Sequence, residues 1–436
     1  MDYLRGLMGI FILIAIAFLL SQNKKQIDWK LVATGLILQI VIAVCVLRIP
    51  LVRNAFDHIG HGVVKFLGFA LSGAQFLFGD LAKNSDAVKA NHNLGFLFAF
   101  QALPTVIFFS AVTSGLYYLG VLQKTVYGFA WVMTKTMRLS GAESLSAAGD
   151  IFLGQTEAPL LVKPFIARMT SSELLCLMTG GMATIAGSVM GAYISFLGGT
   201  DPAQLATFAT YLLCASIMNA PGAIVMAKIF LPETEHQKID RSLAISRESV
   251  GVNIFDALAG GAADGLRLAL NIGAMLLAFI AIIAALNWIL MDGIGSWTGL
   301  NEWVRSSTNN TFSGFSLEYI FGQVFRVIAF AMGVDWSDTL QVGSLLGQKM
   351  VINEFVAYSS LAEMKNASLL TEKSIIISTY ALCGFANFSS IAIQIGGIGG
   401  MAPQRQGDLS KLGIRALLAA SLATMMSGTI AGALLG

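Results

Sequence analysis

The fold is decided by residues 141–198, which read GAESLSAAGDIFLGQTEAPLLVKPFIARMTSSELLCLMTGGMATIAGSVMGAYISFLG. Polar residues interrupt two apolar segments here, at places where a continuous membrane helix would have none. The first interruption is Gly154-Gln155-Thr156-Glu157-Ala158-Pro159, and the second is Thr184-Ile185-Ala186-Gly187-Ser188. Non-helical backbone at membrane depth is tolerated only where protein or water surrounds it. We therefore predict a re-entrant helical hairpin over about 141–167, followed by an interrupted spanning helix.

The second half of the chain repeats this plan. Another hairpin, over about 338–362, carries Asn353-Glu354 at its turn, and the next helix is interrupted at Phe385-Ala386-Asn387-Phe388-Ser389-Ser390. The two units start from opposite faces in the predicted topology, so they form inverted repeats. Inverted repeats with broken helices at matching positions are typical of transporters whose site lies near the midplane of the bilayer.

The composition supports a membrane protein. The chain has 436 residues, of which 56% are hydrophobic and 12% charged, whereas a soluble domain has about 25% charged residues. The mean hydropathy is +0.72. The net charge of only +2 lacks the basic face of a nucleic-acid binder, and the composition excludes a disordered chain. We predict an all-α polytopic membrane protein.

Eight segments have the roughly 20 apolar residues that a spanning helix needs. They lie near 4–22, 31–49, 94–122, 173–198, 205–230, 267–291, 375–396 and 412–434. An even number of spans puts both termini on one side, and the distribution of lysine and arginine favours the outer side. The stretch at about 50–92 is too polar to span, so we expect one or two interfacial amphipathic helices there.

Two motifs mark helix starts. Ser140 with Glu143, and Thr170 with Glu173, fit the capping box in which hydroxyl and carboxylate satisfy free backbone amides.

Two other glutamates, Glu157 and Glu354 in the hairpin turns, mark a functional site. A carboxylate facing lipid costs about 2.5–3.5 kcal/mol, so we expect both to face the protein interior.

Structural explanations for the same polar residues remain open. Gln155, Thr156 and Glu157 could cap a turn, and Glu354 could form an ion pair with Lys349. The hydroxyls of Ser389 and Ser390 could bond back to their own helix and bend it.

Several blocks resemble the hallmark sequences of the concentrative nucleoside transporters, in their short bacterial form with eight spans. The blocks are GQTEAP (154–159), PETE (232–235), NEFVAY (353–358) and GFANFSS (384–390). The resemblance covers essentially the whole chain. It implies a homotrimer in the bacterial inner membrane that imports nucleosides such as uridine by cation symport, rather than an enzyme.

The resemblance also implies two kinds of domain in an elevator-type mechanism. The scaffold would comprise residues 1–122, including the interfacial helices, and 232–315. The moving transport domain would comprise 123–231 and 316–436, each with one hairpin and two spans.

Particular residues take roles by the same resemblance. Gln155, Thr156 and Glu157 would face the nucleobase with Val189. The ribose hydroxyls would be held by Glu354, Asn387 and Ser390, with Phe385 beside the ligand.

A sodium ion, with no organic cofactor, would be bound by Asp150, Thr184 and the carbonyls of Leu153 and Ile185, because oxygen ligands suit a hard cation. The sodium-coupled family members usually have asparagine in place of Asp150. An aspartate could hold sodium more tightly, or take up a proton and convert the coupling.

Three other mechanisms compete with sodium symport. Proton-coupled nucleoside symport is the nearest alternative. An intramembrane hydrolase could use Glu157 and Glu354 as acid and base, but no His, Ser-Lys or H-E-x-x-H constellation supports it. A passive channel is the third alternative. The closed hairpin tips argue against it, because an elevator-type transporter needs gates and a pore needs none.

Overall fold

The computed structural model describes residues 2–83, 97–240, 242–243 and 251–435. Every regular element in these residues is helical, which confirms the predicted all-α class. By length and composition, seven stretches could cross a membrane: Trp29–Arg48, Pro50–Ala82, Phe98–Tyr118, Ser171–Gly198, Pro202–Phe230, Ile254–Thr298 and Pro403–Leu435. Two shorter apolar helices, Tyr3–Leu19 and Phe388–Met401, fall in the predicted first and seventh spans.

The stretch after the second span is helical, as predicted. It forms one long helix, α3 (Pro50–Phe78), followed by the turn η2 (Gly79–Ala82). Its charged residues lie in its first half, where Arg53 pairs with Asp57, and the part after Lys65 is apolar. Its most apolar window has a mean hydropathy of 1.4, so length and composition would allow it to cross a membrane, and its interfacial position stays a prediction. The part of this prediction beyond residue 83 lies outside the described residues.

The centre of the molecule consists of two long helices and two broken ones. Helix α12 (Pro202–Phe230) packs against α21 (Gln406–Leu435). The broken helices are the pairs α10 and α11 (Ser171–Ala183, Gly187–Gly198) and α19 and α20 (Glu372–Leu382, Phe388–Met401). Helix α10 contacts both α12 and α21, so each predicted interruption is a real break inside a buried core.

The two breaks lie against each other and share one side chain. The Asn219 amide of α12 donates to the Ala183 carbonyl (2.8 Å) and to the Cys383 carbonyl (2.6 Å). Gly384 permits this approach, because a Cβ there would lie 2.7 Å from the Ala183 carbonyl oxygen. Ser427 of α21 donates to the Asn219 side-chain oxygen at 2.5 Å. Carbonyls that lose their helical partners are thus satisfied from α12.

Two helical hairpins precede the broken helices. The first contains α8 (Gly141–Gly149), η3 (Ala158–Val162) and α9 (Lys163–Ile166), and the second contains α17 and α18 (Thr339–Val351, Glu354–Asn366). Both predicted capping boxes are confirmed at the starts of α8 and α10.

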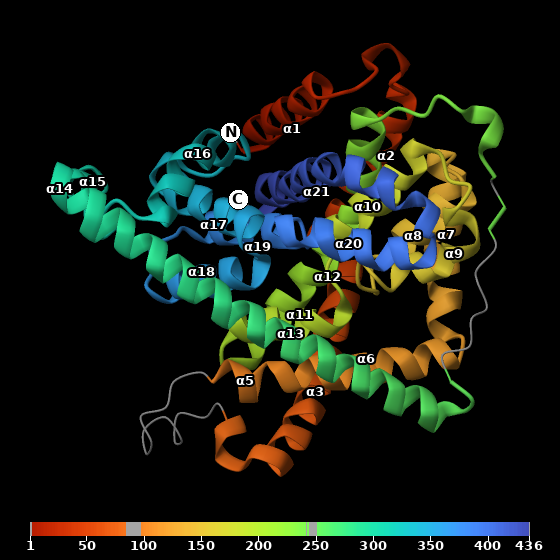
Figure 1. The fold of residues 1–436 in the computed structure, drawn as a ribbon, viewed down its shortest axis with the longest axis horizontal. Coiled ribbons are helices and arrows are strands. Elements are labelled where there is room, and N and C mark those ends of the chain that lie inside the picture. The colour runs from red at the N-terminus through yellow and green to blue at the C-terminus, as the bar shows by residue number, and fades with distance from the viewer. Residues whose placement is uncertain (1, 84–96, 241, 244–250, 436) are drawn as a thin grey trace.

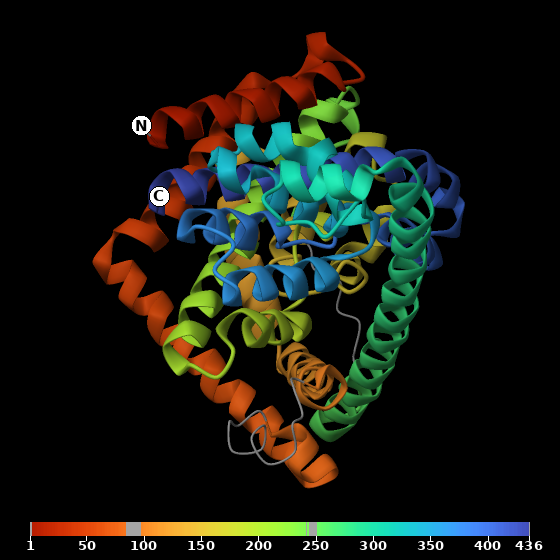
Figure 2. The same cartoon turned by 90° about the vertical axis from the view of Figure 1, so that its left-hand side faces the viewer.

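Long helices flank this core. Helix α13 (Ile254–Trp288) runs across the molecule beside α6 (Leu103–Tyr118), and α3 lies on the other side of the body (Figures 1 and 2). A Cβ at Gly261 or Gly265 of α13 would come within 3.0 Å of α6 atoms. Small residues spaced by four let membrane helices approach closely, so this pair is tightly packed.

The remaining helices complete the two ends. Helix α1 (Asp2–Leu19) packs on α21, and α2 (Trp29–Arg48) packs on α12. The chain termini lie near each other (Figure 1). The connecting elements are α5 (Phe98–Gln101), α7 (Val121–Met137), the π-helix η5 (Ile289–Gly295), α14 (Ser296–Thr298), α15 (Leu300–Ser307), α16 (Leu317–Ala331), and the short turns η1 (Lys24–Gln26), η4 (His236–Lys238), η6 (Trp336–Asp338) and η7 (Pro403–Arg405).

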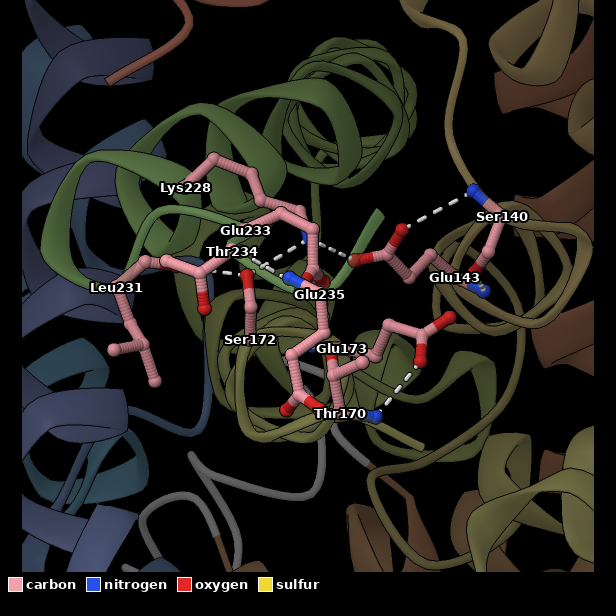
Figure 3. Close-up of polar contacts among 10 residues, drawn as sticks. All are labelled: Ser140, Glu143, Thr170, Ser172, Glu173, Lys228, Leu231, Glu233, Thr234 and Glu235. Carbon is pink, nitrogen blue, oxygen red and sulfur yellow. Dashed lines mark hydrogen bonds and ion pairs between the residues drawn. The ribbon is translucent and has the colours of Figure 1, made fainter. Parts of the chain in front are cut away.

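A buried polar network ties the base of the first hairpin to the core (Figure 3). Lys228, in the last turn of α12, forms an ion pair with Glu143 of α8 and donates to the Ser172 hydroxyl at 2.9 Å. Thr170 donates to Glu233 at 2.7 Å. The PETE block therefore fastens the starts of α8 and α10 to the end of α12.

Glu233 lies outside the spanning helices, and its surroundings favour the charged form. Partial burial raises the pKa of its carboxyl. Hydrogen bonds from Thr170 and from the backbone amides of Glu235 and Thr234, together with the positive charge of Lys228, lower the pKa more, so it lies below its usual value. Hydrogen bonds to a carboxylate stabilise its ionised form.

Candidate functional site

A cavity of about 490 Å³, lined by both polar and apolar side chains, lies where both hairpin turns, both helix breaks and α13 meet. All eight residues predicted to bind substrate line it: Gln155, Thr156, Glu157, Val189, Glu354, Phe385, Asn387 and Ser390. Residues from the two halves, separated by about two hundred positions, thus face one space. Their proximity is a finding, whereas the role of each toward a ligand stays a prediction.

Glu354 is the most constrained residue of the cavity. It is the first residue of α18, directly after the N-cap Asn353, and is 3% exposed. Tyr193 donates to one of its carboxylate oxygens and the Asn387 amide donates to the other, both at 3.0 Å. Each carboxylate oxygen keeps a further lone pair, because a carboxylate can accept about four hydrogen bonds.

The ion pair between Glu354 and Lys349 is not formed. The Lys349 ammonium instead donates to the Ala381 carbonyl and to the Thr424 hydroxyl, each at 2.8 Å. The Glu354 carboxylate is held by neutral groups, so the structural explanation weighed for this residue is wrong.

The break between α19 and α20 presents a second set of polar groups. Asn387 caps α20, with its side-chain oxygen accepting from the Ser390 amide (2.9 Å) and the Ser389 hydroxyl (2.7 Å). The Gln155 amide donates to the Ser390 hydroxyl at 3.1 Å, which joins the first hairpin to the second break. The buried Gln155 side-chain oxygen has no partner. Neither serine bonds back to its helix.

Glu157 is held more loosely than Glu354. Among the described residues the one hydrogen bond of its carboxylate is local, with the Gly154 amide donating to one carboxylate oxygen at 3.2 Å. It also borders a smaller cavity of about 230 Å³, which Asp264 of α13 and Ser114 of α6 line as well. Its carboxylate therefore keeps most of its acceptor capacity for a ligand.

The residues predicted to hold sodium lie beside the first break. Asp150 caps the C-terminus of α8, is 1% exposed, and has two carboxylate oxygens without a hydrogen-bond partner. A Cβ at Gly180 would lie 2.5 Å from one of these oxygens. Thr184 donates to the Gly180 carbonyl at 3.0 Å. Buried carboxylate oxygens without partners fit a bound cation or proton, since an uncompensated buried charge is costly.

The carbonyls of Leu153 and Ile185 complete the predicted ligand set. Both residues lie in non-helical backbone and are buried, and neither carbonyl accepts a hydrogen bond. Oxygen donors with free lone pairs, from a carboxylate and two carbonyls, are the type that a hard monovalent cation prefers.

Sequence reasoning missed one wall of the cavity. Leu268, Asn271, Ile272 and Met275 of α13 line it, with Asn353 and Phe355 from the second hairpin. Asn271 is a polar residue within an apolar span, and this could have marked α13 as facing the site. The apolar residues gave no such signal.

Two halves of one plan, each with a hairpin and a broken helix around one shared cavity, define a secondary transporter. Three family models match the chain. They describe a Na+-dependent nucleoside transporter C-terminus (residues 211–432), the corresponding N-terminus (8–81) and a nucleoside-recognition gate (99–200). The chain belongs to the Na+-dependent nucleoside transporter family, a family of multi-pass membrane transporters and not of enzymes, as predicted.

Individual relatives agree over almost the whole chain. An uncharacterized transporter of Haemophilus influenzae is 42% identical over 100% of this chain and 99% of its own. Sodium/nucleoside cotransporter 2 of Rattus norvegicus is 40% identical over 98% of this chain, which spans 62% of that protein. An inward-facing, substrate-bound structure of CNTnw matches with a TM-score of 0.89 and 39% identity, over 99% of both chains. Outward-facing and intermediate states of CNTnw match equally well, with TM-scores of 0.88 and 0.90.

Proposed function

We propose that this protein imports nucleosides such as uridine, bound in the 490 Å³ cavity, by symport with a cation. The observation that carries the proposal is the convergence on Glu354 of neutral donors from α11 and from the break before α20. A nucleoside is neutral and rich in hydroxyls, so it needs no cationic clamp. A carboxylate held in this way can accept from two vicinal ribose hydroxyls, and such charge-assisted bonds are the stronger kind.

The nucleobase would lie toward the first hairpin. Gln155, Thr156 and Glu157 offer both donors and acceptors, and Val189 and Phe385 offer apolar surfaces on either side. Buried polar groups that lose their partners discriminate strongly against a ligand lacking the matching atom. We therefore propose that this set recognises the base edge, while Glu354, Asn387 and Ser390 recognise the ribose.

Sodium is the favoured coupling ion. Support comes from the family and from the relatives named as sodium/nucleoside cotransporters, together with the free oxygens at Asp150, Leu153 and Ile185. One charge crossing about 100 mV releases roughly 2.3 kcal/mol, and a tenfold cation gradient adds about 1.4 kcal/mol. One cation per nucleoside could then support accumulation of several hundredfold. Proton coupling is the second candidate, because an aspartate occupies the cation site.

An elevator motion in a homotrimer would give alternating access. In this proposal residues 123–231 and 316–436 move past a scaffold that contains the tightly packed α6 and α13 pair. The inward-facing, intermediate and outward-facing structures of the similar protein CNTnw support it. Both termini would lie outside the bacterial inner membrane, as the lysine and arginine distribution predicts.

Radiolabelled uridine uptake into proteoliposomes tests the function. We expect an inward sodium gradient to stimulate uptake, with lithium or choline replacing sodium as controls. Stimulation by a proton gradient alone would transfer the coupling to Asp150 as a proton carrier. Absence of uptake under either gradient for uridine, adenosine and thymidine would overturn the nucleoside proposal.

A further inference from the structure

Lys349 is a buried lysine that the proposed mechanism does not use. It lies near the end of α17 and is 3% exposed. Its ammonium donates to the Ala381 carbonyl and to the Thr424 hydroxyl, and no described carboxylate forms an ion pair with it. A charge in this position is costly unless its surroundings compensate for it.

The end of a helix supplies part of the compensation. Ala381 lies in the last turn of α19, where carbonyls lack helical partners and the helix carries partial negative charge. The carboxylate of Glu354, at the far side of the hairpin turn, forms no ion pair with Lys349 but contributes a longer-range attraction. The ammonium thus bridges the second hairpin, the second break and α21.

The corresponding place in the first half carries the opposite charge. There the hairpin helix α8 ends at Asp150, whose carboxylate lies against Gly180 in the last turn of α10. A carboxylate beside the negative end of a helix is unfavourable, so this place favours the uptake of a cation or a proton from solution. The second half has a cation there already, attached to its own hairpin.

We propose that the Lys349 ammonium is a tethered cation, which fills in the second half the place that the coupling ion takes in the first. Lys349 is a positioning residue: it fixes the turn that presents Glu354 and supplies the positive charge opposite it. In this proposal the lysine keeps its proton throughout the transport cycle, so one free cation moves with each nucleoside. The inference rests on the proposed function and adds its stoichiometry.

The first test measures charge and uridine together in wild-type proteoliposomes. We expect about one elementary charge per uridine and a sodium dependence with a Hill coefficient of about one. Uptake with two charges per uridine would overturn the inference while leaving the proposed function intact. Absence of any uptake would instead be a failure of the proposed function.

The second test removes the tethered charge. In Lys349→Ala we expect uridine affinity at low sodium to fall about tenfold or more, with partial recovery at high sodium and a Hill coefficient above one. The vacated Ala381 carbonyl and Thr424 hydroxyl would then accept a free cation. Wild-type affinity and sodium dependence in this variant would overturn the inference.

Two further variants separate charge from folding. Lys349→Arg keeps a permanent charge, since a guanidinium does not lose its proton, and should keep one-cation coupling. Proton-driven uptake that disappears in Lys349→Arg would show that the lysine releases its proton, and would overturn the inference. Lys228→Ala removes the other buried lysine, outside the cavity. We expect it to lower the melting temperature while leaving sodium dependence unchanged.

Discussion

Among the described residues each half of the molecule buries one lysine, but at opposite ends of the same structural plan. In the first half Lys228 lies at the base of the hairpin, among Glu143 and Glu233, far along α12 from the break. In the second half Lys349 lies at the break itself. The base of the second hairpin instead uses Asp338, which accepts from the Thr371 hydroxyl at 2.8 Å.

The glutamates of the two hairpin turns also differ, in how many other elements hold their carboxylates. Glu354 is held by side chains from two other elements, whereas Glu157 is held by one amide of its own turn. Glu354 is therefore held in place by Asn387 of its own half and Tyr193 of the first half. The first half has free oxygens at Asp150 and Glu157, and these are available to a cation and a nucleobase. The repeated plan has diverged into a preorganised half and a responsive half.

The largest effect should follow from removing the negative charge of Glu354 in the preorganised half. In Glu354→Gln we expect uridine uptake to fall roughly 100-fold or more, because each hydrogen bond to a charged group contributes about 1.5–3 kcal/mol. The loss should persist at every sodium concentration. Glu363→Gln, on an exposed position of the same helix, is the matched control. Uptake in Glu354→Gln equal to this control would remove Glu354 from the ribose site.

A smaller effect, of a different kind, should follow in the responsive half. In Asp150→Asn we expect the sodium affinity to fall about tenfold, a change of about 1.4 kcal/mol. Uptake should become strictly sodium-dependent and lose its response to a proton gradient. The exposed Asp292→Asn is the control. Unchanged sodium and pH responses would exclude Asp150 as the coupling residue, and the comparison between the halves would lose its basis.

The contact between the halves can be tested at Tyr193, which lies in the first half and donates to Glu354 in the second. Tyr193→Phe should lower uridine affinity about fivefold, since a net hydrogen bond contributes about 1 kcal/mol. Tyr211→Phe, in α12 and outside the cavity, should leave affinity unchanged. Equal affinities in the two variants would show that Glu354 is positioned without help from the first half.

The smallest effect concerns the stability of the folded protein in acid, through carboxyls at the bases of the two hairpins. For Glu233 and Asp338, burial raises the pKa, but hydrogen bonds to the carboxylate outweigh it and the pKa is lowered in both. A lowered pKa adds stability that is complete above the usual value, 4.5 for Glu233 and 3.8 for Asp338, and is lost as the pH falls through the folded-state pKa.

Melting temperatures between neutral and acid pH check this expectation. The wild type should lose a few degrees in acid, and Glu233→Gln or Asp338→Asn should each remove part of that loss. A melting curve with the same acid dependence in both variants would show that neither carboxyl contributes.

Sequence reasoning located the site because broken membrane helices have a strong polar signature. Gln155, Glu157, Glu354 and Asn387 stand out in apolar surroundings, and the structure brings them together. The resemblance supplied Val189, which an apolar pattern alone could not distinguish from the core.

The predictions that failed concerned contacts between segments that lie far apart in the sequence. Spacing suggested that Lys349 pairs with Glu354, but the lysine side chain reaches α19 and α21, which no sequence separation reveals. The α13 wall was missed because a cavity-facing leucine and a lipid-facing leucine look alike in sequence.

The hydrogen bonds of the Asn219 amide bear on whether halves can be exchanged between this chain and a relative. Its two acceptors, at Ala183 and Cys383, are main-chain carbonyls, and every residue carries the same carbonyl. This contact between the two breaks therefore does not depend on which side chains stand there, whereas the Gln155–Ser390 and Tyr193–Glu354 bonds between the halves do. Chimeras that join the first half of this chain to the second half of a relative should assemble correctly at their centre, provided that Asn219, a glycine at 384 and the residues of these two bonds are retained.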